Sequence, residues 1–76
     1  MLSDIERKVL RVISNYTAGR RRTPTVDELC TKTGRSRGGI MTVLDVLSRE
    51  EYIEWQQSEP DTMTVLEAWE RKEYSK

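Results

Sequence analysis

The strongest constraint in this sequence is a pair of helix start signals on either side of a glycine. Thr25-Val26-Asp27-Glu28 matches the capping box, in which a Thr hydroxyl and a Glu carboxylate each accept from the other residue's backbone amide. Gly34 fits the left-handed position that ends a helix, and Ser36 is a preferred cap for the next helix. Apolar residues then follow at helical spacing: Ile40, Val43, Leu44 and Leu47. These signals predict two helices, over about 26–33 and about 37–50.

Another helix is expected before this pair. Ser3 to Glu6 repeats the capping-box pattern, and apolar residues recur at positions 5, 9, 12, 13 and 16. Gly19 is a natural left-handed stop. We therefore predict a helix over about 4–17 that ends by Gly19, followed by a loop of three arginines and Pro24, because proline cannot continue a helix.

The apolar pattern changes from helical spacing to alternation at Tyr52, which is typical of a strand. Ser58 to Thr62 contains proline and aspartate and predicts a turn, so the chain is expected to form a two-stranded hairpin over about 52–69, with a short tail at 70–76. A helix from about Asp61 to Tyr74 is the alternative, because Glu67, Ala68 and the charged tail favour helices.

Composition argues against most enzyme classes. The chain has no histidine and one cysteine, Cys30, so the usual general base, the commonest metal ligand and any cysteine cluster are missing. The four glycines do not form a phosphate loop. We expect a protein that is not an enzyme, with no metal, cofactor or small-molecule substrate, and Cys30 is expected to pack in the core. No run approaches the ~20 apolar residues of a membrane span and no signal-peptide pattern opens the chain, so we expect a cytoplasmic location.

Charge divides the chain into two halves, although the net charge is zero. Residues 1–40 carry nine Lys/Arg and four Asp/Glu, whereas residues 41–76 carry four Lys/Arg and nine Asp/Glu. Such a domain can turn one face towards an anion and the other away from it.

Together, the predicted elements make a single α+β domain over residues 1–76, mainly α, with three helices followed by a C-terminal two-stranded β-hairpin. This is the winged helix-turn-helix order, in which the second helix of the pair enters a DNA groove. The chain resembles the N-terminal DNA-binding domain of LexA-type repressors over roughly residues 3–69. The matching positions are Pro24, Thr25, Glu28, Leu29, Cys30, Gly34, Ser36, Leu44, Leu47, Arg49, Ile53 and Glu54.

The resemblance implies a sequence-specific binder of double-stranded DNA that acts on transcription as a dimer. It does not extend to the self-cleaving domain of that family, so it implies no protease function. Three positions depart from the family pattern. Thr33 stands where an apolar residue normally closes the second helix, Gly38 and Gly39 replace larger residues, and Glu51 stands where a glycine is usual.

Candidate base-contacting residues lie at the start of the helix over about 37–50. Arg37 can donate two hydrogen bonds to guanine, and Met41 and Thr42 are expected to face outward with it. The missing side chains of Gly38 and Gly39 either let the start of the helix approach the DNA backbone closely or, for one of the two glycines, allow tight packing against one of the other helices.

Phosphate contacts are expected from the arginine run ahead of residue 26, from the Thr25 hydroxyl and the neighbouring helix amides, and from the turn between the two helices. The full predicted DNA-contacting set is Arg20, Arg21, Arg22, Thr25, Arg35, Ser36, Arg37, Gly38, Met41 and Thr42. With five or six phosphate contacts, the salt slope of binding would be about −5.

Two features oppose this interpretation. Asp45 falls on the same helical stripe as Arg37, although we expect it to pair with Arg49. The predicted wing tip, Gln57 to Asp61, has no Lys or Arg to enter a minor groove. The alternative function is therefore a winged-helix protein-interaction module that uses the acidic hairpin, with Trp69 and Tyr74 as dimer or partner contacts.

Overall fold

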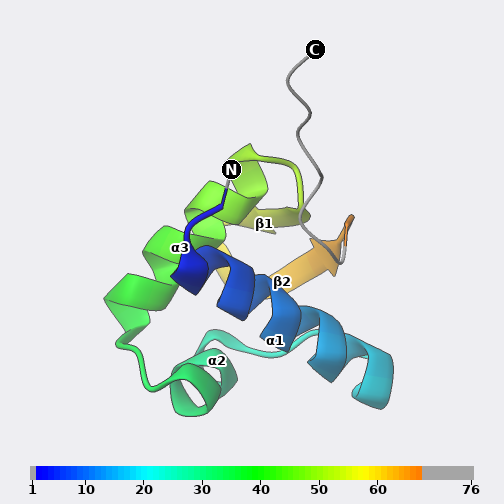
Figure 1. The fold of residues 1–76 in the computed structure, drawn as a ribbon. Helices are drawn as coiled ribbons and strands as arrows, with labels where there is room; N and C mark the ends of the chain where they lie inside the picture. The colour runs from blue at the N-terminus through cyan, green and yellow to red at the C-terminus, as the bar shows by residue number, and fades with distance from the viewer. Residues whose placement is uncertain (1, 68–76) are drawn as a thin grey trace.

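A computed structural model describes residues 2–67 of the chain (Figure 1). Three helices are followed by a two-stranded antiparallel sheet, in the order α1 (Asp4–Arg20), α2 (Val26–Thr33), α3 (Arg37–Arg49), β1 (Ile53–Gln56) and β2 (Glu59–Val65). The predicted fold class is confirmed, because the chain is mainly helical and has the winged helix-turn-helix layout. None of the helices within residues 2–67 is both long and apolar enough to cross a membrane.

Helix α1 begins at the predicted capping box but ends later than predicted. The Ser3 hydroxyl accepts from the Glu6 amide, and the Glu6 carboxylate accepts from the Ser3 amide at 2.8 Å. Gly19 lies inside the helix, and Arg21 takes the left-handed conformation at φ 59° instead. The Arg20 guanidinium lies 4.4 Å from the centre of the Tyr16 ring one turn earlier, and this i,i+4 contact favours the extra helical turn.

Helices α2 and α3 follow their local signals closely. Helix α2 covers the predicted residues and ends at Gly34, whose φ is 73°. Ser36 caps α3, and the helix ends at Arg49, one residue before its predicted end, with Glu50 as the C-terminal cap. Glu51 then adopts φ 65°, a conformation that costs a non-glycine residue about 1 kcal/mol. The cost is offset where the chain turns into β1, because the Tyr52 amide bonds to the Leu47 carbonyl at 2.9 Å and the Tyr52 side chain is buried.

The hairpin turns earlier than predicted. Gln57 and Ser58 form the turn, and Pro60 to Thr62, expected to lie in the turn, belong to β2. The pairing register shifts between Trp55 and Gln56, and the Trp55 indole N–H donates to the Pro60 carbonyl at 3.0 Å. This tertiary bond holds Pro60 in the strand. The predicted strand is therefore confirmed for residues 61–65 and the alternative helix does not form there, while the remainder of the 61–74 segment falls mainly outside the described residues.

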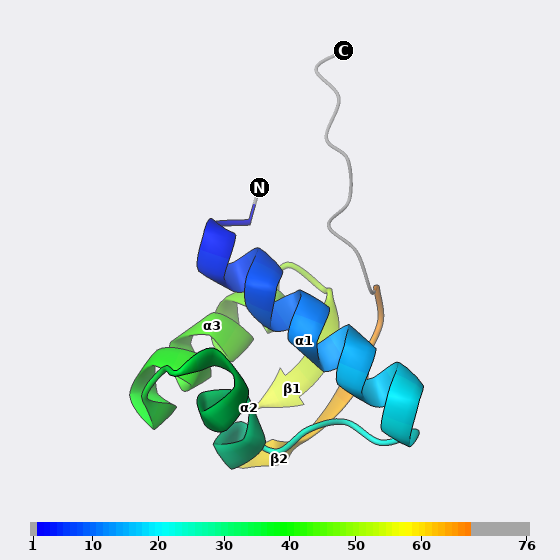
Figure 2. The ribbon, with the colours of Figure 1, turned by 60° about the horizontal axis from the view of Figure 1, so that its bottom comes forward.

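The core lies where α1, α3 and the inner face of the hairpin meet, with α2 closing one side. In Figure 2 α1 crosses the top of the molecule, with α2 and α3 to its left and the strands beneath. Helix α3 packs against α1, α2 and β1. The fully covered side chains include Val9, Ile13, Leu29, Ile40, Leu44, Leu47 and Ile53. Burying each such aliphatic side chain stabilises the fold by about 1.5–3 kcal/mol. The apolar face of α3 is therefore held against the core, and the opposite face of this helix remains in solvent.

Candidate nucleic-acid interface

The first turn of α3 is open to solvent. Ser36, Arg37 and Gly38 are exposed, and this turn has no acidic residue. The Ser36 hydroxyl accepts from the Gly39 amide at 3.1 Å. No atom lies within 4 Å of the position that a Cβ on Gly38 would take, so tight packing does not explain that glycine. The positive end of the α3 dipole is therefore accessible to an anion.

Arg37 reaches back across the turn to α2. Its guanidinium nitrogen lies 2.9 Å from an Asp27 carboxylate oxygen, and the two side chains are 52% and 87% exposed. Sequence analysis did not identify Asp27, because no local spacing links these positions. An exposed pair of this kind contributes at most about 1 kcal/mol, so Arg37 can exchange Asp27 for another acceptor.

Further along α3, the side chains differ in how far they face solvent. Thr42 is exposed, and its hydroxyl donates to the Gly38 carbonyl at 3.0 Å. Met41 is half-buried and packs against the core, so the prediction that it faces fully outward is wrong. Asp45 pairs with Arg49 at 3.1 Å, as its i,i+4 spacing predicts. The outward face of α3 is therefore narrower than the sequence indicated.

The N-terminus of α2 is occupied by the protein's own groups. The Thr25 hydroxyl accepts from the Glu28 amide at 3.2 Å, and the Val26 amide donates to the Asp61 carboxylate on β2 at 2.9 Å. These groups were expected to contact phosphate, but the structure engages them internally. Asp61 was predicted only as a turn residue, and a bond spanning 35 positions has no local sequence signal.

We call Arg20, the last residue of α1, and the following Arg21 and Arg22 the arginine loop. This loop also has internal partners. Arg22 donates to both oxygens of Glu28 at 3.3 and 3.2 Å, so one of the arginines expected to contact phosphate is paired within the protein. The Arg22 guanidinium, the Tyr16 hydroxyl and the Thr25 amide together hold the pKa of Glu28 at about 2. Of the three arginines in this run, Arg21 is the one that is exposed and has no side-chain partner among residues 2–67.

The arginine loop and the start of α3 are not brought together. In Figures 1 and 2 the loop follows α1 on the right of the molecule, α3 begins on the left, and α2 lies between them. Arg35 stands in the turn between α2 and α3, where its side chain is exposed and has no partner among the described residues. The structure thus groups Arg35, Ser36, Arg37, Gly38 and Thr42, and separates them from Arg20, Arg21 and Arg22.

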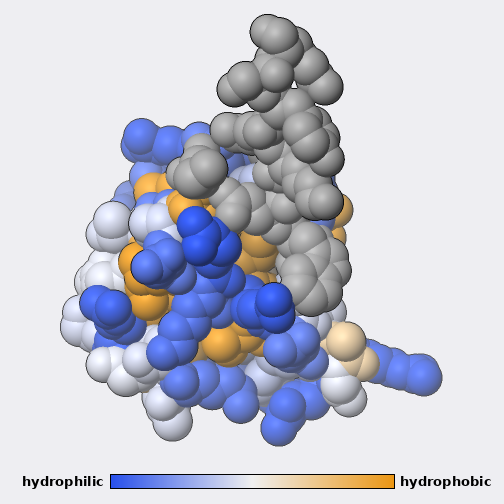
Figure 3. Space-filling model, in the orientation of Figure 1, coloured by the Kyte–Doolittle hydropathy of each residue, from blue (hydrophilic) through white to orange (hydrophobic). Residues whose placement is uncertain are grey.

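The surface in Figure 3 has no broad apolar patch, because hydrophilic side chains divide the apolar areas. Pale areas of intermediate hydropathy lie on the left, over α3, as serine, threonine and glycine there predict. Among the described residues, Leu66 is the one large apolar side chain classed as exposed, at 48%. Cys30 is half-buried and packs against the core, close to its expected place.

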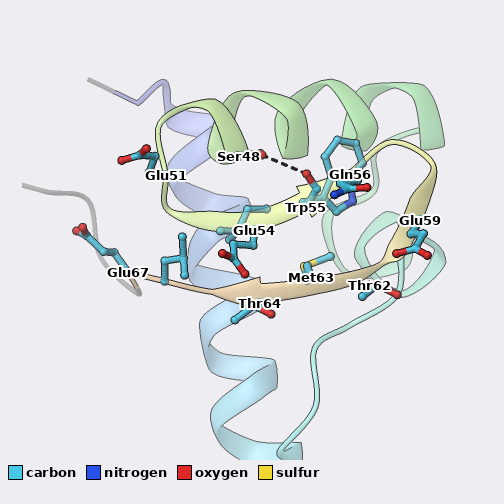
Figure 4. A pocket seen from close by; sticks show the side chains of 12 residues that line it. Ser48, Glu51, Glu54, Trp55, Gln56, Glu59, Thr62, Met63, Thr64 and Glu67 are labelled. Atoms are coloured by element: carbon cyan, nitrogen blue, oxygen red, sulfur yellow. Dashed lines mark hydrogen bonds between the residues drawn. The ribbon is translucent and has the colours of Figure 1, made fainter.

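The hairpin carries an acidic groove on its outer side (Figure 4). Four glutamates line it, Glu51, Glu54, Glu59 and Glu67, and no Lys or Arg does so among residues 2–67. In Figure 4 the Glu54 side chain lies between the two strands, away from the first turn of α3. Trp69 and Tyr74, the expected dimer or partner contacts, lie outside the described residues.

Comparison with known proteins adds no relative: no family model matches the chain, and the curated proteins contain no significant match.

Proposed function

We propose that this chain is a small DNA-binding transcriptional regulator, similar in plan to the LexA-type domain, that reads double-stranded DNA with α3 in the major groove. The observation that carries the proposal is the open first turn of α3. Its cap faces solvent, no acid lies in it, and Arg37, Gly38 and Thr42 are exposed along one side. A helix held on the core by its inner face, with a polar N-terminal end in solvent, suits insertion into a groove.

The contacts divide into two kinds. Arg37 donates to guanine once it leaves Asp27, and Thr42 contacts a base edge. Arg35 and the Ser36 region bind phosphates at the end of the helix dipole. Because the arginine loop lies beyond α2, fewer phosphate contacts are expected than the five or six first counted, and the salt slope should be shallower than about −5.

Fluorescence anisotropy tests the proposal with a labelled random-sequence duplex at about 50 and 200 mM salt. Salt-sensitive binding is expected at the lower concentration. A preferred site is then selected, and Arg37→Ala should reduce discrimination at one base pair by about 1–3 kcal/mol. Arg35→Ala is the matched control, because it should weaken binding to all duplexes by the same factor. Equal, sequence-independent losses from both variants would remove Arg37 from base recognition.

The second candidate is a protein-interaction module. It is favoured by the acidic groove, whose lining includes four glutamates beside the exposed Leu66. This function needs a basic partner and no DNA contact at α3. Absence of duplex binding at 50 mM salt, with protein at high micromolar concentration, would favour it over the DNA-binding proposal.

A further inference from the structure

A shallow hollow lies between the C-terminal half of α1 and the last turn of α2. We call it the tyrosine hollow, and its lining is Val12, Asn15, Tyr16, Arg20 and Lys32. The Arg20 guanidinium lies 4.4 Å and the Lys32 ammonium 5.5 Å from the centre of the Tyr16 ring. The Arg22 guanidinium also lies 5.0 Å from this ring, but it pairs with Glu28 and does not line the hollow. The buried ring thus has two cations beside it, Arg20 and Lys32, at the mouth of one depression.

The carboxylate that accepts from the Tyr16 hydroxyl is already engaged by other groups. Glu28 accepts from the Tyr16 hydroxyl, from both Arg22 nitrogens and from the Thr25 amide. Its acceptor capacity is therefore largely used by these partners. Within residues 2–67, no Asp or Glu forms an ion pair with Arg20 or Lys32.

Two like charges held near one ring repel each other, and an anion between them removes that repulsion. The Asn15 side-chain amide lines the same hollow and can donate a neutral hydrogen bond. A tetrahedral oxyanion can meet an arginine, a lysine and an amide at once through different oxygens, whereas a carboxylate has only two oxygens. Arginine adds planar, paired donors, which match phosphate geometry.

We propose that the tyrosine hollow binds a phosphate group through Arg20, Lys32 and Asn15. This site goes beyond base recognition by α3 and does not depend on it, because none of the residues that line the hollow belongs to α3. The phosphate can belong to a free phosphorylated compound or to a nucleic-acid backbone, and both present the same oxygens to the hollow.

Nuclear magnetic resonance tests the site with inorganic phosphate, titrated against sodium chloride at matched ionic strength. The Asn15 side-chain amide and the Arg20 Nε–H signals should shift and saturate. Lys32→Gln or Arg20→Gln should weaken phosphate binding about threefold each, and the double variant should lose saturation. Arg21→Gln is the matched control, since it removes the same charge from the neighbouring position but does not line the hollow.

A shift that does not saturate, or one that Arg20→Gln and Arg21→Gln reduce equally, would overturn the proposal, because general attraction of anions would then explain it. Since these are surface substitutions, a circular-dichroism melt suffices to show that each variant is folded.

Duplex DNA identifies the source of the phosphate. If the backbone occupies the hollow, the Arg20→Gln/Lys32→Gln variant lowers the salt slope of random-duplex binding by about two. An unchanged slope, with the response to inorganic phosphate lost, assigns the hollow to a free phosphorylated compound. If the protein binds no duplex, the function proposed for α3 is contradicted. The titration with inorganic phosphate still tests whether the tyrosine hollow binds a phosphate group.

Discussion

Helices α2 and α3 follow each other in the chain and both start with a capping hydroxyl, yet their N-termini differ in what covers them. At α2, the capping box is joined by Asp61 from the hairpin, which accepts from the Val26 amide at 2.9 Å. At α3, Ser36 caps the Gly39 amide, no acid lies in the first turn and the space beside Gly38 is open. The protein therefore places carboxylates at the backbone amides of one helix end, whereas a hydroxyl is the cap at the other.

This difference shows which helix end can serve a ligand. Both ends carry the partial positive charge of a helix dipole. At α2 that charge is already used for stability, because it ties the hairpin to the helix pair. At α3 it is available, which is why the proposed DNA contact is assigned to α3 alone.

The largest expected effect concerns Glu28, on which four hydrogen bonds converge at the α2 end. Its pKa is about 2 in the folded protein against an ordinary value of 4.5. The stability it contributes is therefore complete above about pH 4.5 and is lost as the pH falls towards 2. Thermal melts from pH 7 to pH 2.5 should show a shallower decline in Glu28→Gln than in the original chain.

Glu6→Gln is the control for this experiment. Glu6 holds the equivalent place in the α1 capping box but has no ion pair among the described residues. Its variant should keep the original pH dependence. If Glu28→Gln also keeps it, the convergence of bonds on Glu28 does not stabilise the fold.

Asp61→Ala should remove the carboxylate that accepts from the Val26 amide at the N-terminus of α2. Losing a capping interaction of this type costs about 1 kcal/mol, within a range of about 0.5–2 kcal/mol, measured by urea denaturation. Glu59→Ala is the matched control, since Glu59 is exposed on the same strand and has no side-chain partner among residues 2–67. Equal losses in the two variants would mean that the bond from Val26 to Asp61 does not distinguish α2 from α3.

Gly38→Ala should have opposite effects on the free and bound protein. The glycine is helical and has open space beside it, so alanine should stabilise the free chain by about 0.4–1 kcal/mol. The added methyl should weaken duplex binding in anisotropy, because the backbone can no longer approach DNA as closely. Gly19→Ala, also in a helix with open space, should give the stability gain alone. Unchanged duplex affinity in Gly38→Ala would place DNA away from this turn.

The smallest effect is expected at Asp45, which brings negative charge to the face of α3. Removing its pair with Arg49 by Asp45→Asn should cost about 0.3–0.5 kcal/mol of stability. Duplex binding should become slightly tighter, since an acid near phosphate is lost and Arg49 is released. Weaker binding in anisotropy would show that the carboxylate itself takes part in recognition.

Local signals predicted most of the backbone. The capping boxes at Ser3 and Thr25, the stop at Gly34 and the cap at Ser36 all act within four residues, so they can be identified without a structure. Predictions based on a single residue type were less accurate. Gly19 did not end α1, and Pro60 did not form the turn, because Tyr16 and Trp55 make contacts that residue preferences do not contain.

The sequence by itself therefore determined the order of the elements, the α+β class and most of the buried face of α3, Met41 excepted, because periodicity and capping depend on near neighbours. Only the tertiary structure decided which charges are available at the surface. Arg22 pairs with Glu28, Arg37 pairs with Asp27, and the Asp61 carboxylate accepts from the Val26 amide. The partners in these contacts are 6, 10 and 35 positions apart in the sequence. Charges pair through space, so counting charges along the sequence cannot show that the N-terminus of α2 is bound by carboxylates while that of α3 is exposed to solvent.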